Sequence, residues 1–186
     1  ILTASDPEEY ADFGQSVAIS GDTMVIGASG ATVGGKPAAG QVYVFTYSGG
    51  TWTQVKILNA TDASVGAQFG QSVAISGDTA VIGAIWATVG GKHAVGQAYV
   101  FTYSGVTWTQ TAILNASDAA TYDNFGYSVG ISEDGSTAVI GAYGATVQGK
   151  YAAGKAYIFT NSGGSWTQTA ILNASDAATD AQFGQS

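Results

Sequence analysis

The chain is built from one unit that is repeated along its length. The segment Ile1-Leu2-Thr3-Ala4-Ser5-Asp6 recurs in closely similar form at residues 57, 113 and 171, so successive copies lie 56, 56 and 58 residues apart. A fixed period of this size is typical of architectures in which one supersecondary unit stacks on the next. The two additional residues of the third interval fall at Glu133-Asp134-Gly135-Ser136-Thr137, which indicates a surface turn.

Each unit contains four short segments with strand chemistry, bounded by Gly, Ser, Asp or Asn. In the first unit these segments are Phe13 to Ser20, Thr23 to Ala28, Gln41 to Tyr47 and Trp52 to Asn59. The third segment has β-branched and aromatic residues on both faces, which suits a strand that is covered on two sides. The connections between the second and third segments, and between one unit and the next, are longer than the other two. In an antiparallel sheet these longer loops emerge at the same end.

A four-stranded unit that needs cover on both faces predicts an all-β fold made of β-propeller blades, each a four-stranded antiparallel sheet. We expect three full blades and two partial ones, as part of a seven-bladed propeller. The expected division of the chain is 1–12 for the end of a preceding blade, 13–68, 69–124 and 125–182 for blades one to three, and 183–186 for the start of a next blade.

Composition removes several functional classes. The formal net charge is −8, all five basic residues are Lys, and there is no Cys. Nucleic-acid binding is disfavoured because phosphate neutralisation needs clustered basic residues. Disulfides and thiolate metal sites are excluded. The sequence has no apolar run long enough for a transmembrane helix.

Two dipeptides that recur in register make the chain resemble the FG-GAP repeats of integrin-like β-propellers. A Phe-Gly pair opens each unit's first strand, and a Gly-Ala pair closes the second; the family's following Pro is replaced by Ser29, Ile85 and Tyr143. The resemblance implies structural roles for Phe13, Gly14, Gly27, Ala28, Phe69, Gly70, Gly83, Ala84, Phe125, Gly126, Gly141, Ala142, Phe183 and Gly184. The Phe is expected to pack between blades, while Gly permits close approach of backbones.

The family's calcium loop has no counterpart among these residues. Integrin-type blades often carry several Asp in the turn after the first strand, whereas this chain has single carboxylates at Asp22 and Asp78 and two at Glu133 and Asp134. One or two carboxylates do not supply the six to eight oxygens that Ca²⁺ takes. We therefore expect no metal and no cofactor, and interpret these Asp residues as turn formers.

Three tripeptides match the acceptor signal for N-linked glycans, always where the fourth strand enters its long loop. Their asparagines are Asn59, Asn115 and Asn173. Two explanations remain open, because duplication of one turn asparagine would place them in the same register without any sugar.

Other recurring residues have both structural and functional interpretations. Acidic side chains in the loops between units are expected to form a solvated turn face rather than a cation site, and loop lysines are candidates to pair with them across blades; these are Asp6, Asp62, Asp118, Asp176, Asp12, Asp123 and Asp180, and Lys36, Lys92 and Lys150. The fourth-strand tryptophans, Trp52, Trp108 and Trp166, are interpreted as packing residues. Trp86 lies in a long loop and is the best single candidate for a contact residue.

No constellation for catalysis is visible, because His93 is the only histidine and has no oriented partner in the pattern. The sequence predicts a non-catalytic extracellular or cell-surface propeller segment for adhesion or structural assembly. Its expected partners are proteins or copies of itself, with glycans as a further class. The alternatives are a carbohydrate-binding propeller and the propeller domain of a larger secreted enzyme.

Overall fold

The computed structural model describes all 186 residues and consists of strands, turns and loops without a helix. The first sheet contains β1 (Phe13–Ser20), β2 (Thr23–Ala28), β3 (Gln41–Ser48) and β4 (Thr51–Leu58). The second contains β5 (Phe69–Ser76), β6 (Thr79–Ala84), β7 (Gln97–Tyr103) and β8 (Trp108–Leu114). The third contains β9 (Val129–Ile131), β10 (Thr137–Ala142), β11 (Lys155–Ser162) and β12 (Ser165–Leu172).

Each strand pairs with the next strand along the chain, so every sheet is an antiparallel meander. The prediction of an all-β chain with four-stranded antiparallel units is confirmed. The third and fourth strands of every sheet shift register at the same point, at Val44/Phe45, Val100/Phe101 and Ile158/Phe159. The backbone therefore repeats with the sequence, and the register shift between the third and fourth strands is repeated too.

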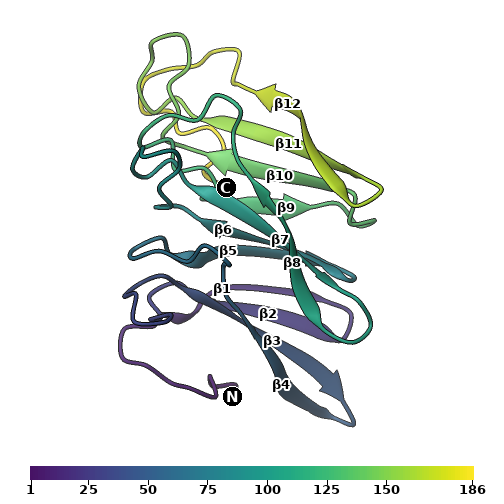
Figure 1. The fold of residues 1–186 in the computed structure, drawn as a ribbon. Helices are drawn as coiled ribbons and strands as arrows, with labels where there is room; N and C mark the ends of the chain where they lie inside the picture. The colour runs from purple at the N-terminus through teal and green to yellow at the C-terminus, as the bar shows by residue number, and fades with distance from the viewer.

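The three sheets stack one upon another, from the purple N-terminal sheet to the yellow C-terminal sheet (Figure 1). The closest contacts between sheets involve their first strands, because β5 packs against β1 and β2, and β9 packs against β5 and β6. The long loops gather at one end of the stack, on the left of Figure 1, and the tight hairpins lie at the other. This arrangement matches the loop rim expected from the sequence.

The hydrophobic core lies between the sheets. One cluster joins Val25, Val44 and Leu58 of the first sheet to Phe69 and Ile82 of the second. A second cluster continues the pattern between the second and third sheets. A third, smaller cluster that includes Ile26, Tyr43 and Phe45 lies on the first sheet and is covered by the segment that precedes it. The two larger clusters show that most of the core is formed between sheets.

The two outer faces of the stack expose side chains that are buried elsewhere in the repeat. Val25 and Val81 are 0% exposed, whereas the equivalent Val139 of the third sheet is 41% exposed. On the opposite side of the stack, Ile19 is 58% exposed and its equivalent Ile75 only 8%. Both outer faces therefore have the chemistry of a sheet–sheet interface.

Candidate functional site

The glycines of the two recurring dipeptides contact each other across the sheet interfaces. Gly27 lies against the Gly70 carbonyl, and the same contact joins Gly83 to Gly126 and Gly141 to Gly184. A Cβ atom at the first member of each pair would collide with the carbonyl oxygen of the second. Since these first members have no positive φ, it is the close approach of two backbones that requires glycine here.

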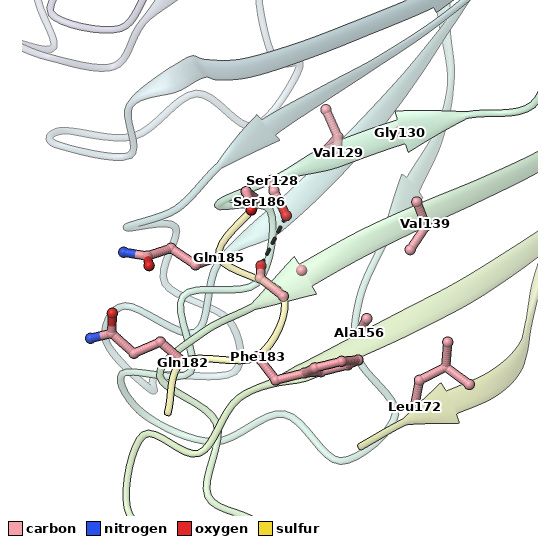
Figure 2. A pocket seen from close by; sticks show the side chains of 12 residues that line it. Ser128, Val129, Gly130, Val139, Ala156, Leu172, Gln182, Phe183, Gln185 and Ser186 are labelled. Atoms are coloured by element: carbon pink, nitrogen blue, oxygen red, sulfur yellow. Dashed lines mark hydrogen bonds between the residues drawn. The ribbon is translucent and has the colours of Figure 1, made fainter. Parts of the chain in front are cut away.

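A serine hydroxyl holds each of these glycine contacts together. Ser16 Oγ donates to Gly70 O at 2.7 Å, and Ser72 Oγ donates to Gly126 O at 2.7 Å. The third copy, Ser128 Oγ to Gly184 O at 2.9 Å, is drawn as a dashed line in Figure 2. Each serine belongs to one sheet and each carbonyl to the first strand segment of the next, so the bond joins successive units.

In each of the three complete units, the phenylalanine of the Phe-Gly pair packs on two aromatic rings of its own unit. Phe69 meets Tyr99 and Phe101 with ring centroids 5.3 and 5.8 Å apart, both edge to face. Phe125 repeats this arrangement with Tyr157 and Phe159 at 5.3 and 6.0 Å. Both phenylalanines are 0% exposed, whereas Phe183, whose ring lies over the open face of the third sheet beside Ala156 and Leu172, is 37% exposed (Figure 2).

Backbone hydrogen bonds connect the long loops of neighbouring units. Phe69 N donates to Ala39 O at 2.9 Å, and Gln68 N donates to Ala38 O at 3.0 Å. The equivalent bonds are formed by Phe125 with Val95 and by Phe183 with Ala153. The loop rim is therefore a continuous hydrogen-bonded structure rather than a set of independent loops.

A glutamine in each fourth strand clamps the loop that leads into its unit, a contact that we did not predict. Gln110 Oε1 accepts from Thr61 N at 3.0 Å, and Gln110 Nε2 donates to Thr61 Oγ1 at 2.8 Å. Gln54 with Ser5 and Gln168 with Ser117 form the same pair of bonds. The signal was the Trp-Thr-Gln run present in every unit, but the partner lies 49 to 51 residues away in the chain.

The three candidate glycan acceptors lie on the surface at the ends of their fourth strands. Asn59, Asn115 and Asn173 are all exposed. Asn115 Oδ1 accepts a hydrogen bond from Gln97 Nε2 at 3.2 Å. Their exposure is compatible with modification, and occupancy stays a prediction.

The predicted pairing of loop lysines with loop acids is wrong. Lys36 Nζ donates to Ala63 O at 2.6 Å, and Lys92 Nζ donates to Ala119 O at 2.8 Å, so both bind backbone carbonyls of the next loop. The single ion pair joins Lys155 Nζ to Asp118 Oδ2 at 2.6 Å. A long lysine side chain reaches the carbonyl because the two loops already run side by side through their backbone bonds.

Acidic residues of the loops also approach the buried tyrosines of the third strands. Tyr157 donates its hydroxyl to Asp118 Oδ1 at 2.8 Å, whereas Tyr99 donates to Gln97 Oε1 at 3.0 Å. Burial raises the pKa of both tyrosines, and the nearby carboxylates Asp118 and Asp62 raise it further. These phenols stay neutral and act as buried donors.

Replacing Lys155 with Gln, the residue at this position in the first two units, should change stability in a pH-dependent way. Burial raises the pKa of Asp118. Hydrogen bonds from Lys155 and Tyr157 together lower it by more than burial raises it, so the pKa lies below its ordinary value. A carboxyl group whose pKa is lowered by folding stabilises the fold fully at pH values above its ordinary pKa of 3.8. This stabilisation is lost as the pH falls through the pKa of the folded state.

At pH 7 we expect the free energy of unfolding of the Lys155→Gln variant to be lower by up to about 1 kcal/mol, because both partners are partly exposed. Urea unfolding at pH 7 and at pH 3 measures the difference, which should shrink at the lower pH. An equal difference at both pH values would contradict the ion-pair explanation.

The acidic turn of the third unit binds its own backbone. Asp134 accepts from the Ser132 hydroxyl at 2.5 Å, from Ser136 N at 3.0 Å and from the Ser136 hydroxyl at 2.8 Å. These hydrogen bonds lower the pKa of Asp134 to about 2, and the bond from the Ser132 side chain has the largest effect. The carboxylate therefore acts as a turn former at this position.

Asp123 differs from the other loop acids because it is buried. Its Oδ2 accepts from Ala120 N at 2.8 Å, which closes the loop before the third unit. Burial raises the pKa of Asp123, and the Ala120 hydrogen bond opposes part of that effect. Nowhere in the chain do three His, Asp or Glu side chains come together as a metal-binding group.

Of the tryptophans singled out in the sequence, two pack in hairpins and one is exposed. Trp52 packs against Tyr47 at 5.3 Å and Trp108 against Tyr103 at 5.5 Å, which agrees with the expected hairpin packing. Trp86 is 41% exposed on the loop rim. In the other units glycine stands at its position, and a Cβ at Gly144 would meet the Tyr122 carbonyl. His93 is exposed in the same loop, which connects β6 to β7.

Radially stacked four-stranded sheets joined through their first strands define the class of the protein, which is built like the blades of a β-propeller. A family model described as FG-GAP repeat matches residues 1–45, 52–101 and 108–159. The chain therefore belongs to the FG-GAP repeat family. A comparison with curated proteins found no significant match.

The second and third family matches start in the fourth strand of one sheet and end in the third strand of the next. Sequence repeat and sheet are thus out of phase by one strand, so each family repeat contributes to two blades. Repeats of this family are typical of extracellular or cell-surface proteins and commonly mediate protein–protein contacts. No helix of the structure has the length and apolar character needed to cross a membrane.

Proposed function

We propose that this chain is a non-catalytic segment of an extracellular β-propeller that serves adhesion or a structural surface assembly through protein–protein contacts. The observation that carries the proposal is that the repeated side chains form hydrogen bonds within the chain. Ser72 and Gln110, like their counterparts in other units, bind segments that are distant in the chain, and the buried Tyr99 donates to Gln97 within its own strand. The repeated residues thus hold a scaffold together, and the side chains that differ between units remain at the loop rim for recognition.

The contacts of the titratable side chains support the proposal that the chain is non-catalytic. His93 is an exposed loop side chain, Asp123 binds a backbone amide, and Asp118 binds Tyr157 and Lys155. General acid–base chemistry would need an oriented partner within hydrogen-bond reach of such a group. We infer that the chain binds rather than converts its partners.

We further propose that equivalent blades cover the two outer faces within a seven-bladed ring. The exposures of Val139 and Ile19, against the burial of their counterparts, support this packing. Closed propellers usually contain four to eight blades, and three are present here. The glycan acceptors Asn59, Asn115 and Asn173 would then be spaced regularly around the loop rim.

Surface labelling and intact-mass measurement of the native protein test this function. A membrane-impermeant amine reagent applied to whole cells should modify the exposed loop lysines, and peptide-N-glycosidase should lower the intact mass if the acceptors carry glycans. Cross-linking on the same cells should capture a protein partner or a second copy. Labelling that appears only after lysis would contradict the proposed location, and turnover of a substrate by these blades would contradict the non-catalytic role.

A further inference from the structure

The third unit departs from the repeat at the loop rim by gathering tyrosines. Four positions at the loop rim of this unit hold Tyr. At three of these positions neither of the other two units has a tyrosine. The tyrosine patch consists of Tyr122, Tyr127, Tyr143 and Tyr151; the first unit has Tyr10, Gln15, Ser29 and Pro37 there, and the second has Gly66, Gln71, Ile85 and His93. A repeat scaffold explains shared residues, but it does not explain a change confined to one unit.

Two members of the tyrosine patch are in direct contact. Tyr127 and Tyr143 meet edge to face with ring centroids 4.5 Å apart. In the first unit, the Ser29 hydroxyl donates to the Gln15 side chain at the same place. The third unit therefore has an aromatic pair where the first unit has a hydrogen-bonded polar pair.

The two other tyrosines flank this pair. The Tyr122 backbone lies beside Gly144, the residue that follows Tyr143. Tyr151 belongs to the same loop as Tyr143, the connection between β10 and β11. Trp86 belongs to the adjacent loop, which is tied to the patch by a hydrogen bond of 3.3 Å from Asn124 Nδ2 to Ile85 O.

The tyrosine patch has hydroxyls that the protein does not use. None of its four phenols forms an intramolecular hydrogen bond, whereas the buried Tyr43, Tyr99 and Tyr157 all donate one. Tyr122 and Tyr151 are 56% and 63% exposed. Tyrosines with wet hydroxyls and exposed rings offer both stacking faces and hydrogen-bonding groups to a ligand.

The charge around the patch is balanced. Asp123 is buried beneath it and bonded to Ala120 N. Lys150 and Asp180 flank Tyr151, the first by sequence and the second through a bond of 2.9 Å from Asp180 N to Tyr151 O. A ligand that gains its affinity from charge would find no cluster of one sign here, and an acidic one would be repelled by the net charge of −8.

We propose that the tyrosine patch, with Trp86 at its edge, binds a neutral oligosaccharide. The apolar C–H faces of a sugar ring stack on exposed aromatic rings, and its hydroxyls match the free phenols. This role goes beyond the proposed protein contacts, because sugar binding by the isolated chain does not require the extracellular assembly.

The test compares repeat-swapped variants of the whole chain. Cellohexaose, xylohexaose, mannohexaose and chitohexaose are titrated into the protein by calorimetry, with NMR of the tyrosine ring protons as a second readout. The double variant Tyr127→Gln/Tyr143→Ser installs the residues of the first unit, so it keeps a loop pairing that the fold already contains. We expect affinity for the bound sugar to fall about tenfold, which corresponds to about 1.4 kcal/mol, because the double variant removes both contacting rings.

Tyr10→Gly is the matched control, because it removes an exposed rim tyrosine from the first unit and installs the residue of the second. Its affinity should stay within about twofold of the unmodified chain. The reverse graft Gln15→Tyr/Ser29→Tyr should create a second site of the same specificity. Failure of all four sugars to bind, equal loss in the control, or binding unaffected by the double variant would overturn the proposal.

Discussion

Replacing Gly83 with alanine should lower the free energy of unfolding by about 3 kcal/mol, at the upper end of overpacking effects. The added methyl group would collide with the Gly126 carbonyl and with the Ser72 hydroxyl that binds it. Both partners are fixed by the sheet–sheet interface, so the collision can be relieved only by separating the second and third sheets. Urea unfolding followed by tryptophan fluorescence measures the change.

Gly141→Ala is the matched control because it makes the same change at the equivalent position. Its partner Gly184 lines an open cavity and is partly exposed, whereas Gly126 is buried, so the two variants are compared in residues 1–186. The backbone around Gly184 can shift, so we expect a loss of about 1 kcal/mol. Similar losses for the two variants would show that the methyl group acts locally and that the interface is not the cause.

Truncation of Phe125 to alanine should cost about 4 kcal/mol, as for a large aromatic side chain removed from a packed core. The ring is 0% exposed and fills the space between the second and third sheets while contacting Tyr157 and Phe159. Phe183→Ala makes the same truncation at a ring that is 37% exposed, and it should cost about 1 kcal/mol. Thermal and urea unfolding measure both variants.

A milder variant keeps this test informative if Phe125→Ala does not fold. Phe125→Leu retains most of the apolar volume, and we expect a loss of about 1 kcal/mol with cooperative unfolding. Equal effects of the truncations at Phe125 and Phe183 would contradict the conclusion that stability comes from burial between sheets.

The expected strands agree with the structure because their pattern is local. The first two strands of the first unit begin and end at the expected residues, and the next two differ by one residue at their ends. Turn glycines and alternating small and β-branched residues are sufficient to define such segments. The repeat then supplies the second and third sheets by analogy.

Side-chain partners were less predictable than strands. Lys36 and Lys92 were expected to meet acids, but carbonyls lie nearer once the loops run side by side. The Tyr127–Tyr143 contact of the tyrosine patch also escaped the sequence pattern, because the two residues are 16 positions apart in the chain (143 − 127) and meet only through tertiary packing. Aligning the units and looking for departures confined to one of them would have found it.

The amino-acid pattern by itself determined the repeating four-stranded unit, since strand, turn and period are encoded within about 56 consecutive residues. Only the tertiary structure decided which atoms meet between units. The Gly83–Gly126 contact, the Gln110 clamp and the tyrosine patch each join segments whose separation in the chain says nothing about their distance in space. That distance is fixed by the stacking of sheets, which buries the apolar faces that no unit can bury alone.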